Sequence, residues 1–161
     1  MSIELPLYGQ EKDNTCALAC LRMVLAACGT DVEESTLEGE AHLEPAGTEI
    51  GELERLVRQF GLSADIQEVP IEHLEQLFAE GKLAIAYIDR AVFDLTPAQR
   101  TKHTLRSAKM HVVVPTRVTA ASVTFHDPLQ PRITRKSIRL FRAAYEHLGS
   151  RCVVCSRPGA V

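Results

Sequence analysis

Apolar positions recur with helical spacing in four segments of the first half of the chain: residues 16–28, 30–40, 48–61 and 70–81. The first, CALACLRMVLAAC, is apolar around most of its circumference, which predicts a buried helix that stops at Gly29. The next is short and acidic, and the other two carry one apolar face each. The residues expected to start these later helices are Asp31, Thr48 and Pro70, and the expected stops are Gly61 and Gly81.

The second half carries compact apolar runs that predict strands at residues 82–89, 110–118, 122–127 and 151–156. A late helix is expected at residues 137–149, SIRLFRAAYEHLG. Helices followed by strands indicate an α+β fold, in which N-terminal helices pack on a C-terminal antiparallel sheet. The polar stretch 89–109 interrupts this pattern, and it is long for a plain connection. We therefore expect it to form either a short helix or a functional loop.

Composition narrows the class of protein. The 161 residues fit one domain, spanning 1–161, and 45% hydrophobic with 24% charged residues is ordinary for a globular protein. A net charge of −3 and the absence of tryptophan argue against nucleic-acid binding. No apolar run is long enough for a membrane span, and the N-terminus lacks the features of a signal peptide. We expect a cytoplasmic protein whose five cysteines are reduced thiols.

Four residues suggest nucleophilic catalysis. Cys16 stands at the start of the first predicted helix, where free N–H groups and the helix dipole favour a thiolate. His111 opens the apolar run HVVVP and is the best candidate for the base. If the strands at 110–118 and 122–127 are antiparallel neighbours, Asp127 lies near the same end and can orient the imidazole. Gln10 could donate a side-chain N–H to an oxyanion beside the backbone N–H of Cys16.

The motifs Q-x5-CALACL, MHVVV and HDP together resemble the C39 peptidase family of papain-like cysteine proteases, best known as leader-peptide-cleaving domains of bacteriocin exporters. The resemblance implies a papain-like fold in a bacterial protein. It implies Cys16 as nucleophile, His111 as base, Asp127 as orienting acid and Gln10 as oxyanion donor. The implied substrate is a peptide or protein with small residues, often Gly-Gly, before the cut. A separately encoded transporter is a conceivable partner for such a free-standing domain.

The sequence departs from the family pattern in three places. Ala17 stands where the family has a glycine after the nucleophile, and it is small enough to do little harm. Thr15 replaces the aspartate directly before the nucleophile, with Asp13 two positions further back. The stretch 89–109 is longer than the family pattern leads us to expect. Because this stretch leads into His111, it suggests a substrate different from a standard double-glycine leader.

The remaining cysteines and histidines have simpler expected roles. Cys20 and Cys28 are expected to pack in the core. His126 alternates with Asp127 in a strand, so the two side chains should face opposite sides. The CVVC motif at 152–155 would likewise point its thiols to opposite faces, which argues against a metal site. The histidines expected at the surface are His42, His73, His103 and His147, and of these only His103 is also a candidate for contact with substrate, because its loop precedes His111.

Other functions use the same residues differently. A deamidase, transglutaminase or isopeptidase would need the same triad with another leaving group or acceptor. A non-catalytic peptide-binding module would keep the fold, but its expected mark, a lost Cys, His or Gln, is missing here. A thiol redox or metal protein would use the thiols of Cys16, Cys20, Cys152 and Cys155. The leading hypothesis is a cysteine peptidase without cofactor or metal.

Overall fold

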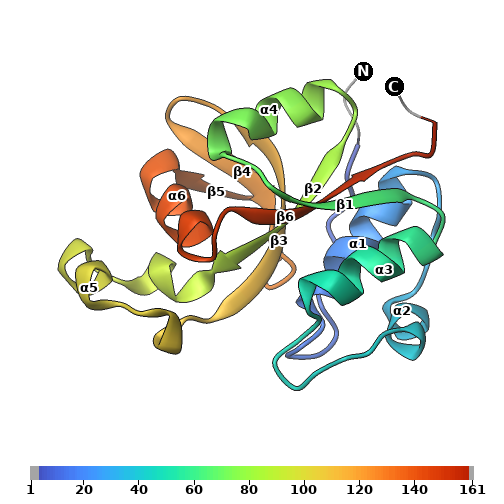
Figure 1. Cartoon of the computed structure of the whole chain (residues 1–161), viewed down its shortest axis with the longest axis horizontal. Coiled ribbons are helices and arrows are strands. Elements are labelled where there is room, and N and C mark those ends of the chain that lie inside the picture. Colours follow the sequence, from blue (N-terminus) through green and yellow to red (C-terminus); the bar gives the residue numbers. More distant parts are fainter. Residues whose placement is uncertain (1–3, 160–161) are drawn as a thin grey trace.

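A computed structural model of the chain describes residues 4–159 and confirms the α+β fold (Figure 1). The helices are α1 (Cys16–Ala27), α2 (Glu34–Glu40), α3 (Ile50–Gln59), α4 (Ile71–Ala79), α5 (Pro97–Lys102) and α6 (Ile138–His147). The strands are β1 (Ser63–Glu68), β2 (Leu83–Asp89), β3 (Met110–Val118), β4 (Ser122–His126), β5 (Thr134–Ser137) and β6 (Arg151–Ser156). Short 3-10 turns, η1 (Arg90–Asp94) and η2 (Leu105–Ser107), flank α5.

The strands form one six-stranded sheet in the order β1-β6-β2-β3-β4-β5, and every neighbouring pair is antiparallel. Helices α1 and α3 lie on one face of the sheet, and α4 and α6 lie on the other (Figure 1). The apolar runs of the sequence analysis correspond to β2, β3, β4 and β6. Strands β1 and β5 are absent from that prediction because both are edge strands with polar sequences, SADIQE and TRKS.

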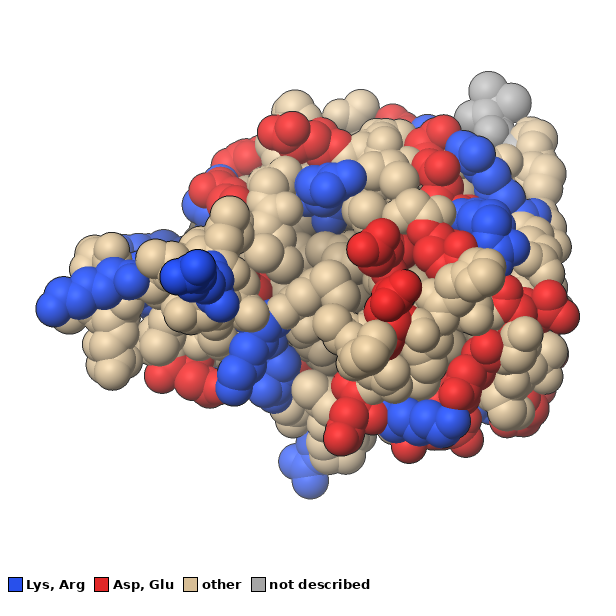
Figure 2. Space-filling view, turned by 60° about the horizontal axis from the view of Figure 1, so that its bottom comes forward, with Lys and Arg blue, Asp and Glu red and all other residues tan. Residues whose placement is uncertain are grey.

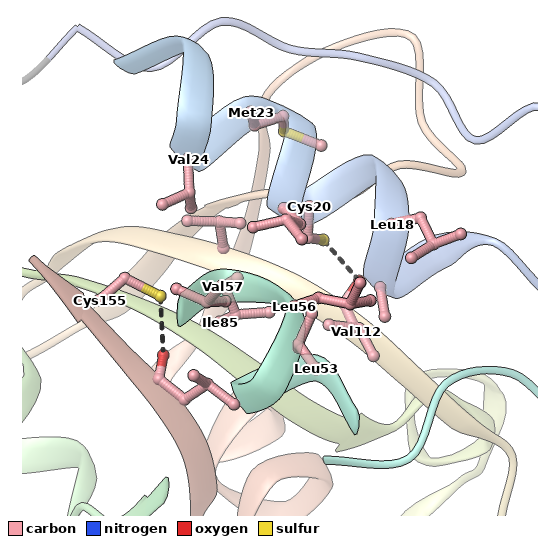
Figure 3. Packing of buried hydrophobic residues seen from close by; sticks show 14 of the residues in the cluster. Leu18, Cys20, Met23, Val24, Leu53, Leu56, Val57, Ile85, Val112 and Cys155 are labelled. Carbon is pink, nitrogen blue, oxygen red and sulfur yellow. Dashed lines mark hydrogen bonds between the residues drawn. The ribbon is translucent and has the colours of Figure 1, made fainter. Parts of the chain in front are cut away.

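The larger part of the core lies between α1, α3 and the sheet (Figure 3). The apolar side chains that meet there include Leu18, Met23, Val24, Leu53, Leu56, Val57, Ile85 and Val112, all fully buried. Cys20 belongs to the same cluster, and its thiol donates a hydrogen bond to the carbonyl of Val112 at 3.3 Å. The continuous apolar surface of α1 is thus explained by contacts with both α3 and the sheet.

Side chains of α3 also cover one edge of the sheet. The guanidinium of Arg58 donates to the carbonyl of Ala64 in β1 from Nε at 3.0 Å and from Nη2 at 2.7 Å. Glu54, one turn earlier, accepts the N–H of Ile66 at 2.8 Å and lies 3.6 Å from Arg58. Main-chain groups of β1 that have no strand neighbour are therefore satisfied by side chains.

Two expected helix caps are wrong. Helix α2 begins after Glu33 and not after Asp31, and α3 begins after Glu49 and not after Thr48. Thr48 is fully buried, and its carbonyl accepts a hydrogen bond of 2.8 Å from the hydroxyl of Tyr87 in β2. The tertiary contact with the sheet therefore outweighs the local capping preference of threonine.

The stretch between β2 and β3 forms short helical segments, so the expectation of a short helix there is confirmed. Its α5 begins with a capping box between Thr96 and Gln99, whose side chains bond each other's backbone N–H groups. In Figure 1 this segment projects from the body of the protein at the left. Within residues 4–159, no helix has the length and apolar character that a bilayer crossing requires.

Candidate active site

Cys16 is the first residue of α1, as predicted, and only 5% of its surface is exposed. A tight loop, closed by hydrogen bonds between Lys12 and Thr15, directly precedes Cys16. The hydroxyl of Thr15 both donates to the carbonyl of Lys12 and accepts its N–H, each at 3.0 Å. Because that hydroxyl faces back into the loop, it does not cap the helix, and the first N–H groups of α1 remain available near the thiol.

His111 and Asp127 meet at one end of the β3–β4 pair. Nε2 of His111 donates to Oδ1 of Asp127 at 2.7 Å, and both side chains are buried. The same carboxylate oxygen accepts the N–H of Leu129 at 2.9 Å, which holds the Asp127 side chain in place. With Nε2 engaged, Nδ1 is the imidazole nitrogen left for the thiol of Cys16.

The environment favours the charged forms of His111 and Asp127. Burial alone would disfavour the His111 imidazolium, but the hydrogen bond with Asp127 and the contact with Cys16 outweigh it and raise the pKa of His111 to about 9. Burial likewise opposes ionisation of Asp127, yet its bond with His111 holds the pKa of that carboxyl below its usual range. A protonated imidazole between a carboxylate and a thiol is the electrostatic arrangement that stabilises a thiolate.

Gln10 lies in the loop before α1 and is tied to the segment that follows Asp127. Its backbone N–H donates to the carbonyl of Pro128 at 3.0 Å. Its side-chain Nε2 donates to the carbonyls of Lys12 and Asp13, at 2.8 Å and 3.2 Å. Gln10 is therefore held in the loop that leads to Cys16, with its amide hydrogens bonded to that loop.

Two supporting residues are absent from the sequence analysis. Glu34 in α2 is 1% exposed and accepts the N–H of Glu11 at 3.0 Å, which braces the loop before α1. Arg90 directly follows β2, and its Nε lies 4.0 Å from Oδ2 of Asp127. Arg90 could have been found from the sequence, because it is a charged residue directly after a largely apolar, fully buried strand. Glu34 could not, because it is one of several acidic residues in its segment.

A hollow of about 560 Å³ borders the candidate site at Met110, the residue before His111. Its lining residues are Glu49, Ile50, Gly51, Tyr87, Leu105, Ala108, Met110, Leu148 and Arg151. Another lining residue, Tyr87, lies near Cys16: burial is the chief cause that raises the pKa of the Tyr87 phenol, and the Cys16 side chain adds to it. Figure 2 shows this face, with basic side chains over the projecting segment at the left and acidic side chains to the right of the centre.

The thiols of the CVVC motif are separated from this site. Cys152 and Cys155 lie in the two different core clusters, on opposite faces of the sheet, as predicted for a CVVC strand. Burial is the main cause that raises the pKa of Cys152 to about 11. None of the five cysteines forms a disulfide.

The histidines divide into two groups. His126 turns away from Asp127, and its Nδ1 donates to the carbonyl of Pro6 at 3.1 Å. The surface prediction is wrong for His103, whose side chain is 8% exposed and lies 2.6 Å from the buried carboxylate of Asp89. His147, 24% exposed, lies 3.5 Å from the same carboxylate. The sequence pattern missed this contact because it joins three distant segments.

Comparisons with known proteins identify relatives of this chain. The family model described as "Peptidase C39 family" matches residues 4–149. Among proteins of curated function, none matches this sequence. A C39-like peptidase from Bacillus anthracis has a similar solved structure, with a TM-score of 0.77 and 18% identity over 96% of this chain and 95% of that one.

Two further solved structures share the fold. One is the peptidase domain of Streptococcus ComA, a bi-functional ABC transporter involved in quorum sensing, with a TM-score of 0.70 and 14% identity over 96% of this chain and 99% of that one. The other is a double glycine motif protease from an AMS/PCAT transporter, solved with its leader peptide, with a TM-score of 0.68 and 16% identity over 96% and 92% of the two chains.

Proposed function

Because this chain belongs to the Peptidase C39 family and is a cysteine peptidase, we propose that Cys16, His111 and Asp127 are its catalytic triad, carried by one domain. The observation that carries the proposal is the position of His111 between the other two groups. One imidazole nitrogen bonds Asp127 at 2.7 Å, and contact with the Cys16 side chain contributes to its raised pKa. Asp127 orients the ring and stabilises its charged form.

In the proposed reaction the Cys16 sulfur attacks the carbonyl carbon of the scissile peptide bond. The sulfur–carbon bond forms, and the carbonyl π electrons move to the oxygen. His111, which holds the proton taken from the thiol, gives it to the leaving amine as the carbon–nitrogen bond breaks. Water, deprotonated by His111, then attacks the resulting thioester and releases the acid and the free thiol.

Gln10 is proposed to stabilise the oxyanion together with the backbone N–H of Cys16. Its side-chain bond to Asp13, at 3.2 Å, is longer than its bond to Lys12, at 2.8 Å. The bond to Asp13 is the one that a substrate oxygen would replace. The bond from Gln10 N–H to Pro128 keeps this loop beside the segment that carries Asp127.

The proposed substrate is a peptide with small residues, such as Gly-Gly, before the cut. Its upstream residues would occupy the hollow between α3 and the projecting segment. One solved relative is in complex with a leader peptide, which favours a leader-like substrate, delivered by a transporter partner.

The pH dependence of Cys16 alkylation by iodoacetamide tests the triad. In the wild type the thiol should react well below pH 8.5, the usual pKa of a free cysteine. In His111→Ala the pH at which alkylation becomes fast should rise toward 8.5. The control His73→Ala, at an exposed position, should behave as wild type. Reaction of wild-type Cys16 as an ordinary thiol would contradict the proposal.

A peptide library assay tests the specificity. Peptides with Gly-Gly before the cut should be cleaved by the wild type and left intact by Cys16→Ala. Cleavage should fall sharply when either glycine is replaced by leucine. A wild-type protein that binds these peptides and cleaves none of them would indicate a non-catalytic peptide-binding module instead.

A further inference from the structure

A carboxylate and two imidazoles converge outside the catalytic centre. Asp89 ends β2 and is fully buried, His103 follows α5, and His147 ends α6. One donor atom from each of the three lies within 4.8 Å of the other two. We propose that Asp89, His103 and His147 bind a divalent transition-metal ion of the zinc type.

The Asp89 carboxylate is oriented for such a role. Its Oδ1 accepts the N–H of Ala91 at 3.1 Å and the N–H of Lys109 at 2.9 Å. These bonds settle the side-chain rotamer and turn Oδ2 toward the two imidazoles. Hydrogen bonds to the second oxygen of a ligating carboxylate are a regular support of metal sites.

The distances suit a small cation after one adjustment. Oδ2 of Asp89 lies 3.5 Å from Nε2 of His147 and 2.6 Å from Nε2 of His103. Ligands about 2.0–2.2 Å from a tetrahedral ion lie roughly 3.3 Å apart, so the His147 separation already fits. The His103 contact is a hydrogen bond that lengthens by roughly 0.7 Å when the ion replaces its proton.

His147 supplies a second argument. Its Nε2 is buried and has no hydrogen-bond partner of good geometry among residues 4–159. The rings of His103 and His147 lie 5.0 Å apart between centroids, and Nε2 of each lies within 3.5 Å of the same Asp89 oxygen. An ion bound to Oδ2 would satisfy this orphaned nitrogen.

The ligand chemistry selects the metal. Two imidazole nitrogens and one carboxylate oxygen suit zinc and its first-row neighbours, whereas magnesium and calcium prefer oxygen ligands alone. Three protein ligands leave a fourth position for water. Binding would join the projecting segment to β2 and α6, and so would steady Leu105 and Met110 in the wall of the hollow.

Zinc titration by calorimetry tests the proposal, in the full chain carrying Cys16→Ala so that the nucleophile cannot bind the ion. We expect one zinc ion per chain. Adding His147→Gln or His103→Ala should weaken binding about tenfold or more, and adding His73→Ala should leave it unchanged. Absence of zinc binding, or equal binding in all variants, would overturn the site.

Cobalt(II) in the same proteins identifies the ligands without reference to peptidase activity. The expected spectrum has visible bands of a low-coordinate ion and lacks the near-ultraviolet sulfur-to-cobalt charge-transfer band, which would reveal thiol ligands and refute the assignment. Zinc should also raise the Tm of the Cys16→Ala protein, and this rise should be lost when His147→Gln is added. His147 is partly exposed, so this change should leave the chain folded.

Discussion

The thiol of Cys20 donates to the carbonyl of Val112 at 3.3 Å, which joins α1 to β3 close to Cys16 and His111. Cys20 lies one helical turn after Cys16, and Val112 directly follows His111. The bond therefore sets how far the helix start lies from the imidazole. Burial is the chief reason that the pKa of Cys20 is raised well above its ordinary value, so this thiol stays neutral and remains a donor.

Replacement of Cys20 by alanine should lower the free energy of unfolding by about 1–2 kcal/mol, since it removes a buried sulfur and one hydrogen bond. Cys28→Ala is the matched control, because Cys28 is half-buried at the other end of the helix and should cost less. Urea denaturation measures both. Equal losses in the two variants would show that the bond to Val112 has no special weight.

The raised pKa of His111 predicts the alkaline limit of activity. The imidazolium that protonates the leaving amine is present below about pH 9 and is lost as the pH rises through that value. In Asp127→Asn the supporting charge is gone, so the alkaline limb of kcat/KM should move down by roughly 1 to 3 in pH. Asp94→Asn, an exposed change on the projecting segment, should keep the wild-type profile. A limb that stays near pH 9 without Asp127 would refute the electrostatic coupling.

Gln10→Ala should lower kcat by about 10²–10³-fold and change KM much less, because an oxyanion donor acts mainly in the transition state. The fold should persist, since the backbone bond from Gln10 to Pro128 remains and the two side-chain bonds that are lost lie within one exposed loop. Steady-state kinetics with a Gly-Gly peptide and a thermal melt provide the two readouts. An unchanged kcat would remove Gln10 from the oxyanion site.

Leu105 is 66% exposed and lines the hollow. Leu105→Asp should raise KM for an apolar leader-like peptide about tenfold, with little effect on kcat, because it removes apolar contact away from the reacting atoms. Ile133→Asp changes a residue that is 58% exposed and outside the lining, so it serves as the control. An equal rise of KM in both variants would show that the substrate residues before the cut bind outside this hollow.

Much of the framework follows from periodicity alone. Strands β2, β3 and β6 are apolar because they lie inside the sheet, and helix α1 is apolar all round because it packs on both the sheet and α3. Periodicity does not predict the edge strands β1 and β5, because edge strands carry polar side chains and their sequences resemble those of loops. Local capping rules likewise failed at Thr48, where a bond from Tyr87 decides the conformation.

Within the candidate site, the sequence predicts the residues that stand at the start or end of a helix or strand. Cys16 starts a helix, and His111 opens a strand whose neighbour leads into Asp127. It does not predict that Asp89, His103 and His147 converge, because their contact depends on how the projecting segment folds back. Long-range side-chain geometry of this kind carries no local periodic signal.

The ion pair of Arg58 and Glu54 along β1 has a consequence for the behaviour of the protein at high concentration. An open sheet edge is a template on which another chain can add a strand and begin aggregation. Here a guanidinium and a carboxylate from α3 already hold the carbonyl of Ala64 and the N–H of Ile66. A docking strand would first have to displace a charged pair from both groups, so this edge resists edge-to-edge growth into fibrils.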